Sequence, residues 1–248
     1  MTHMVCGYPN ISESEEIFKT LSKYSEYLEV QFPFSDPIAD GPIIEKANEI
    51  ALVNGITTEK CFDFIVNNSP LPQGRGARGE GPKILIMTYY NILLNYGVEK
   101  FIKKAKSVGV YGFIIPDIPF DEEDGKTIRE LCKKYNIVFT ELISPITTNS
   151  RLKEIKKLNP ELIYAISQNM TTGSKSEFGD KFRKYIINLK KIFNTGQNIG
   201  VGFGVKTKID VEKVCEISDF AIIGSEFIKK LNSGGIEEVE KYLKEITK

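Results

Sequence analysis

One acidic side chain lies inside an apolar segment. Glu29 interrupts the run Tyr27–Phe32, which otherwise has the pattern of a buried β-strand. Side chains alternate along a strand, so Leu28 and Val30 share the face toward the helices and Glu29 points inward. A carboxyl group there is costly unless it is paired, protonated or used. Burial raises the pKa of a carboxyl group, so we expect Glu29 to give and take a proton near neutral pH. A structural glutamate held by core hydrogen bonds is the alternative.

Two more carboxyl groups follow this run in a loop rich in proline and glycine. Asp36 and Asp40 lie in the segment PFSDPIADGP, residues 33–42. Such a loop, at the carboxyl end of a strand, can bring one carboxylate across a cavity from Glu29. The alternative for each residue is a local turn, because aspartates in such loops often bond their own backbone.

Three later loops carry glycine where an anion could bind. Gly202-Phe203-Gly204 and Gly224-Ser225 each end an apolar run, and Thr171–Ser174 follows another. Glycine lets backbone N–H groups approach an anion, and a helix N-terminus adds partial positive charge. We therefore predict a phosphate monoester held by main-chain amides, with no lysine required. Ordinary turns are the alternative reading of these glycines.

The segments that would position these residues alternate regularly. Eight short apolar runs, several of them apolar on both faces as in buried parallel strands, are separated by stretches with helical periodicity. This predicts an α/β fold, a single-domain (β/α)8 TIM barrel over residues 1–248, with functional groups at the carboxyl ends of the strands. An open doubly wound sheet is the rival fold. Ser12 and Glu15 predict a capping box at the first helix. The predicted strands are His3–Cys6, Tyr27–Phe32, Ile84–Tyr89, Gly112–Ile115, Ile137–Leu142, Leu162–Ile166, Ile199–Gly202 and Phe220–Ile223, and the predicted helices are Ser12–Tyr24, Ile43–Asn54, Glu99–Val108, Asp121–Tyr135, Asn149–Leu158, Asp180–Phe193, Ile209–Glu216 and Ile236–Ile246.

One segment does not fit this alternation. Residues 69–82 read SPLPQGRGARGEGP, a composition that cannot bury a core. We expect a mobile loop that joins a helix to the next strand, on the barrel face away from the chemistry. A small nucleic-acid contact through its arginines is the weaker alternative.

Composition excludes several classes of protein. The 248 residues carry 33 basic and 33 acidic side chains, which argues against binding nucleic acid or membranes through overall charge. Four scattered cysteines fit a reducing, cytoplasmic location and offer no paired metal ligands. A single histidine, His3, excludes a histidine-rich metal site, and a Ser-His-Asp triad would have to use it. No run of apolar residues is long enough to span a bilayer, and we expect no signal peptide, because the N-terminus lacks a basic region followed by a long apolar one.

Taken in order along the chain, these motifs resemble the tryptophan synthase alpha chain family. The resemblance rests on Glu29, the 33–42 loop, Pro116-Asp117-Ile118-Pro119 and the three glycine loops, and it runs from Gly7-Tyr8-Pro9 to Gly224-Ser225. It implies cleavage of indole-3-glycerol phosphate to indole and D-glyceraldehyde 3-phosphate by a retro-aldol reaction without a cofactor or metal. It also implies a beta-chain partner in an alpha2-beta2 tetramer.

The resemblance also implies roles for individual residues. Glu29 matches the acid/base that protonates the indole carbon carrying the side chain and takes the proton of the adjacent hydroxyl. Asp40 matches the aspartate that holds the indole N–H, and Tyr164 matches a tyrosine beside the catalytic glutamate. Thr172 matches a loop threonine that helps to hold Asp40 when the site closes. The matches to the phosphate cradle are Gly173, Gly204, Gly224 and Ser225.

The chain departs from the family pattern at several positions. Gln31 and Phe32 follow Glu29 where the family has glycine two residues after it, and we expect them to narrow the pocket or tilt Glu29. Gln168 and Met170 replace an arginine and a glycine near Thr172, and we expect no counterpart of the helix that precedes the first strand in the family.

Two alternatives to an active alpha chain follow from these residues. One is a catalytically weakened, alpha-like protein that binds and activates a beta subunit. The other is a different phosphate-binding barrel lyase or isomerase of the same pathway. His3 stands where the family often has an apolar pocket residue, and we interpret it as structural.

Overall fold

The computed structural model describes residues 1–69, 81–118, 120, 122–166, 180–194, 196–202 and 204–247. Its strands are β1 (Thr2–Val5), β2 (Tyr27–Gln31), β3 (Lys83–Met87), β4 (Gly112–Ile114), β5 (Val138–Phe139), β6 (Glu141–Ile143), β7 (Leu162–Ile166), β8 (Asn198–Gly202) and β9 (Phe220–Ile222). Its helices are α1 (Ile11–Ser22), α2 (Pro42–Val53), α3 (Thr58–Asn68), α4 (Tyr90–Tyr96), α5 (Val98–Ser107), α6 (Glu123–Lys134), α7 (Asn149–Leu158), α8 (Asp180–Ile192), α9 (Lys208–Cys215) and α10 (Ser225–Ile246).

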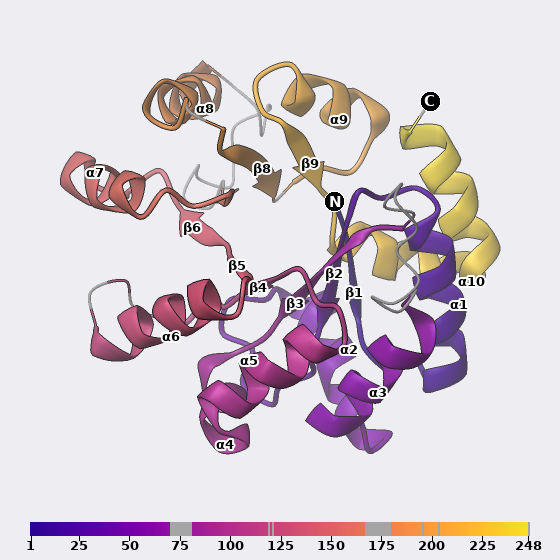
Figure 1. Cartoon of the computed structure of the whole chain (residues 1–248). Coiled ribbons are helices and arrows are strands. Elements are labelled where there is room, and N and C mark those ends of the chain that lie inside the picture. The colour runs from indigo at the N-terminus through magenta and orange to yellow at the C-terminus, as the bar shows by residue number, and fades with distance from the viewer. Residues whose placement is uncertain are drawn as a thin grey trace.

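The strands form a closed parallel ring. One ladder runs in order from β1 to β5 and a second from β6 to β9. Thr2 bridges Ile223, whose N–H donates to the Met1 carbonyl at 3.1 Å, so the last strand meets the first. β5 and β6 are halves of one strand bent at Thr140, whose N–H donates to Phe113 O at 2.9 Å. The predicted (β/α)8 barrel is therefore confirmed, with strands at the centre and helices around them (Figure 1).

Two apolar layers hold the ring together. The outward faces of the strands pack against the helices, and Leu28 and Val30 belong to this outer layer, as strand alternation predicted. Burying each such side chain contributes about 1.5–3 kcal/mol. A smaller inner cluster fills the barrel below the site. Its members are Tyr27, Leu85, Met87, Tyr89, Ile114 and Leu162.

The first helix begins differently from the prediction. Asn10 is its N-cap, and the Asn10 side-chain oxygen accepts from the Glu13 N–H at 3.0 Å. Ser12 and Glu15 lie inside the helix, so the predicted capping box is wrong. Asparagine caps helices as well as serine does, and the cap falls two residues earlier than the serine suggested.

Two helices were not predicted, and one is broken. Thr57 caps α3 by accepting from the Lys60 N–H at 3.3 Å, and α4 is only seven residues long. α10 contains two helical pieces separated at Gly234 and Gly235. Gly235 has φ +66°, a conformation that side chains with a Cβ rarely adopt. The predicted helix Ile236–Ile246 is the second piece.

Only the ends of the proline- and glycine-rich segment lie within the described residues. Residues 70–80 lie outside the described residues, so the expected mobile loop at 69–82 is not tested. α3 ends just before this segment and β3 begins just after it, which puts its ends on the amino side of the strands. Within the described residues, no helix has the length and apolar character needed to cross a membrane.

Candidate active site

A cavity of about 480 Å³ opens at the carboxyl ends of the strands. Of the eight predicted site residues, six lie within the described part of the chain, and all six line this cavity: Glu29, Asp40, Tyr164, Gly204, Gly224 and Ser225. Thr172 and Gly173 lie outside the described residues, as do Gln168 and Met170. The barrel therefore brings together residues that are up to 196 positions apart in the sequence (29 to 225).

Glu29 points into the barrel, as predicted. The residue is only 5% exposed, and the strand register places it between His3 on β1 and Leu85 on β3. Glu29 Oε1 lies 3.1 Å from His3 Nδ1. Glu29 Oε2 is buried and has no hydrogen-bond partner among the described residues. The protein thus contacts one carboxylate oxygen and shields the other from solvent.

Asp40 reaches the same cavity from the loop that follows β2. Its Oδ2 accepts a hydrogen bond from Gln31 Nε2 at 2.6 Å and another from the Tyr89 hydroxyl at 3.0 Å. Burial raises the pKa of Asp40, and this outweighs the opposite effect of the two donors. Asp36, the other candidate in this loop, is exposed and lines a separate surface hollow.

Gln31 and Phe32 do not line the cavity, so the expectation that they narrow it was wrong. Gln31 is fully buried beneath Asp40, and its Nε2 also lies 3.3 Å from Asn48 Oδ1 on α2. Phe32 faces outward and packs edge-on against Phe62. Strand alternation separates the two side chains, and neither lines the cavity.

Tyr164 occupies space that a neighbouring glycine leaves open. A Cβ atom at Gly202 would lie 2.4 Å from the Tyr164 hydroxyl oxygen, so any larger residue there would displace the ring. Burial raises the pKa of Tyr164 well above its ordinary value, and the charges of Glu29 and Asp40 raise it further. Tyr164 therefore stays protonated. Gly202, assigned from the sequence to anion binding, has a packing role here.

One end of the cavity has the features of an anion site. Gly224 is the N-cap of α10, Ser225 is its first residue, and both line the cavity. The backbone N–H groups of a first helical turn have no carbonyl partner within the helix, so they are available to an anion. Gly204, with φ +81°, and Lys206 line the same cavity. From the sequence we predicted an anion held by main-chain amides alone, and Lys206 was missed. The position of Lys206, two residues after Gly204, could have indicated that its side chain lies at this cavity.

Much of the remaining cavity wall is apolar. Such a wall suits a flat aromatic ring, which would lie with one edge near Glu29 and Asp40. No group of three or more His, Cys, Asp or Glu within the described ranges could hold a metal ion. The apolar wall is formed by Met87, Ile114, Pro116, Leu142, Ile166 and Ile222.

The sequence model of the family described as "Tryptophan synthase alpha chain" matches residues 1–248. This chain belongs to the tryptophan synthase alpha chain family. A tryptophan synthase alpha chain from Christiangramia forsetii is 37% identical over 245 residues, covering 98% of this chain and 92% of that protein. One from Syntrophotalea carbinolica is 34% identical over 247 residues, covering 99% and 93%. The structure of tryptophan synthase subunit alpha from Campylobacter jejuni superposes with a TM-score of 0.84 at 31% identity, covering 99% of this chain and 94% of that one.

Membership of the tryptophan synthase alpha chain family decides between the functional hypotheses. The family carries out the indole-glycerol phosphate cleavage of tryptophan biosynthesis, a carbon–carbon lyase reaction, and it implies a beta-chain partner. It does not favour an activator without activity of its own, nor a different lyase or isomerase of the pathway.

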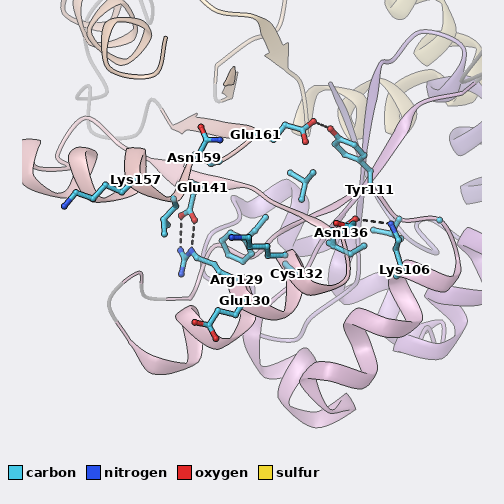
Figure 2. A pocket seen from close by; sticks show the side chains of 18 residues that line it. Lys106, Tyr111, Arg129, Glu130, Cys132, Asn136, Glu141, Lys157, Asn159 and Glu161 are labelled. Carbon is cyan, nitrogen blue, oxygen red and sulfur yellow. Dashed lines mark hydrogen bonds and ion pairs between the residues drawn. The ribbon is translucent and has the colours of Figure 1, made fainter. Parts of the chain in front are cut away.

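A larger cavity, of about 910 Å³, lies at the amino ends of β4, β5 and β7. Several of its charged groups are paired with the protein itself: Arg129 with Glu141, Glu161 with the Tyr111 hydroxyl, and Lys106 Nζ with the Asn136 carbonyl at 3.1 Å (Figure 2). In barrels of this fold, active sites lie at the opposite face, at the carboxyl ends of the strands. We therefore interpret this cavity as structural.

Proposed function

We propose that this chain cleaves indole-3-glycerol phosphate to indole and D-glyceraldehyde 3-phosphate by a retro-aldol reaction, with Glu29 and Asp40 as its catalytic residues. The observation that carries the assignment is the shared cavity. Two carboxyl groups, an apolar wall and a helix start lie on one space whose volume suits a small aromatic phosphate ester. Neither a cofactor nor a metal is needed for the steps below.

The phosphate would bind at the start of α10. Backbone N–H groups at Gly224 and Ser225, the helix dipole and the glycine at position 204 favour an anion there, and the charge of Lys206 adds to this preference. By analogy with the family, Thr172 and Gly173 complete the closed site. Anchoring the phosphate fixes the position of the carbon–carbon bond relative to Glu29.

The indole ring would then lie along the apolar wall, with its N–H toward Asp40. As the ring carbon is protonated, positive charge develops at the ring nitrogen, and the Asp40 carboxylate stabilises it. Glu29 supplies the proton to the ring carbon. The same carboxylate then takes the hydroxyl proton as the carbon–carbon bond breaks. Tyr164, whose ring occupies the space next to Gly202, lines the same cavity as Glu29.

Ser225→Asp should raise KM by about tenfold or more, because like charges at contact distance repel strongly in a partly desolvated site. Aspartate in the first turn favours the helix itself, so unfolding would not explain the loss. Steady-state kinetics with Ser225→Asn as the neutral control measure the effect. An unchanged KM in the aspartate variant would place the phosphate elsewhere.

Gln31→Met should shift the acid limb of the kcat/KM profile to higher pH. The Gln31 amide donates to the charged form of Asp40, so its loss raises the pKa of Asp40 further. Asp40 is then neutral over a wider range at low pH and no longer stabilises positive charge. Profiles of kcat/KM measured between about pH 5 and pH 8 for both proteins check this. Thermal melting verifies that the variant folds. Superimposable profiles would separate Gln31 from the reaction.

We further infer that the chain works with a beta chain in an alpha2-beta2 tetramer in the cytoplasm, as one barrel over residues 1–248. Analytical ultracentrifugation of the chain, alone and mixed with a tryptophan synthase beta chain, tests the assembly.

The activity itself is tested by incubating the purified chain with indole-3-glycerol phosphate, with and without a beta chain, and measuring glyceraldehyde 3-phosphate. We expect release by the chain alone and faster release in the mixture. Stimulation of the beta chain without any substrate cleavage would overturn the proposal in favour of an activator. Binding or turnover of a different phosphate ester in its place would also overturn it.

A further inference from the structure

His3 lies opposite Glu29 inside the barrel. The two residues are register partners on β1 and β2, so their side chains leave neighbouring strands on the same face. They are 4% and 5% exposed, and both line the cavity. No other side chain among the described residues forms a hydrogen bond or ion pair with the Glu29 carboxylate.

The contact between them is made at one atom of each side chain. His3 Nδ1 lies 3.1 Å from Glu29 Oε1, while His3 Nε2 and Glu29 Oε2 are buried without a partner among the described residues. An imidazole that bonds a carboxylate through Nδ1 must carry its proton there. The geometry therefore gives the two carboxylate oxygens different surroundings.

We propose that His3 is a positioning residue for Glu29: its Nδ1–H holds Oε1 and so fixes the orientation of the carboxyl group that exchanges protons with the substrate. This inference rests on the proposed role of Glu29. The proton on the Glu29 carboxyl group passes to the ring carbon that carries the side chain. When the carbon–carbon bond breaks, its electron pair returns to the ring, the hydroxyl proton passes to the Glu29 carboxylate and the aldehyde forms. Glu29 ends with the proton count it began with.

The same contact stabilises the intermediate state of Glu29. After Glu29 has given up its proton, the carboxylate is buried and charged, and the His3 N–H supplies a hydrogen bond to it. Such a bond favours the charged form of Glu29, which is required between the two proton transfers. His3 would thus both orient the carboxylate and lower the free energy of that step.

The surroundings of His3 determine its protonation. Burial lowers the pKa of His3, but the Glu29 carboxylate opposite it has the larger combined effect, and Asp40 adds to it, so the net direction is upward. The other titratable groups nearby are Tyr164 on β7, the Met1 amino group and Lys206 on the cavity wall. Removing the charge of Glu29 should therefore lower the pKa of His3.

NMR tests this coupling without any reference to activity. His3 is the only histidine in the sequence, so the chain without a histidine tag gives a single imidazole signal. In Glu29→Gln, we expect the pKa read from that signal to fall by about 1 or more relative to the unsubstituted chain. Glu161→Gln, which removes an acidic group at the other end of the barrel, is the matched control and should leave the pKa unchanged. Equal values in all three proteins would overturn the proposal.

Kinetics test the positioning role. His3→Gln keeps a side-chain donor that does not titrate, and His3→Phe keeps the ring shape without a donor. We expect kcat to fall by about tenfold or more in His3→Phe with little change in KM, and His3→Gln to recover most of it. The pH profile of His3→Gln should lose the titration assigned to His3 by NMR.

The two proposals fail in different ways. If Glu29→Gln abolishes cleavage but His3→Phe is as active as the unsubstituted chain, His3 does not position Glu29 and the proposed function stands. If the unsubstituted chain cleaves nothing, the proposed function fails and the role of His3 fails with it, even where NMR shows the pair to be coupled. Thermal melting of both His3 variants verifies that they fold.

Discussion

Glu29→Gln should abolish indole formation while leaving the substrate bound. Glutamine has nearly the same shape and can still accept the hydrogen bond from His3 through its amide oxygen, but its amide neither gives nor takes a proton. Because Glu29 is proposed to act in both proton transfers, we expect kcat to fall by about 10²–10⁴-fold or more. The rate of indole release under saturating substrate measures this loss.

Two controls separate chemistry from structure in this experiment. Substrate affinity, measured by calorimetry with the inactive variant, should stay close to the KM of the unsubstituted chain, because the phosphate and ring contacts are intact. Glu29→Asp keeps the carboxyl group but withdraws it from the cavity, and it should retain partial activity. A glutamine variant with near-normal kcat would exclude Glu29 as the acid/base.

Arg129→Met should cause a large loss of stability. Arg129 on α6 forms a two-pronged contact with Glu141 on β6, with Nε–Oε1 at 2.6 Å and Nη2–Oε2 at 2.9 Å (Figure 2). Its guanidinium group also lies over the rings of Phe120 and Phe139. Removing it leaves the Glu141 carboxylate buried and unpaired, which costs about 3–5 kcal/mol. Urea unfolding followed by circular dichroism measures this difference in unfolding free energy.

The double variant Arg129→Met, Glu141→Leu provides the control for this prediction. Replacing both charges with apolar groups removes the unpaired carboxylate, so most of the lost stability should return. The cleavage rate of the double variant should be close to normal, since Arg129 lies outside the active-site cavity. A single variant that is as stable as the double one would show that the pair contributes little.

Periodicity was sufficient to predict where the main elements lie. The fifth apolar run illustrates the limit of this approach. It was predicted as one strand, Ile137–Leu142, and its bend at Thr140 depends on pairing with β4 on one side and β7 on the other. A pairing partner far away in the sequence leaves no local pattern. The short helix α4 was missed for a related reason, because seven residues are too few to show a helical period.

The direction of Glu29 followed from alternation within a single strand, but its contacts did not. Its partner His3 is set by the register between β1 and β2, and sequence alone does not give that register. The contact between Gln31 and Asp40 depends on how the loop after β2 folds back over the strand. For this reason Gln31 was predicted to disturb Glu29, whereas the structure places it under the other carboxyl group.

The seam between β9 and β1 has a consequence for how the protein is made. Thr2 is synthesised before its partner Ile223, which is added more than 200 residues later. Until then, β1 has a neighbour on one side only, and the helix start at Ser225 does not exist. A nascent chain therefore has neither a complete ring nor the proposed phosphate anchor until β9 and the start of α10 have been made. The ability to process substrate should consequently appear all at once, when these last elements join the ring, rather than growing as successive β/α units emerge.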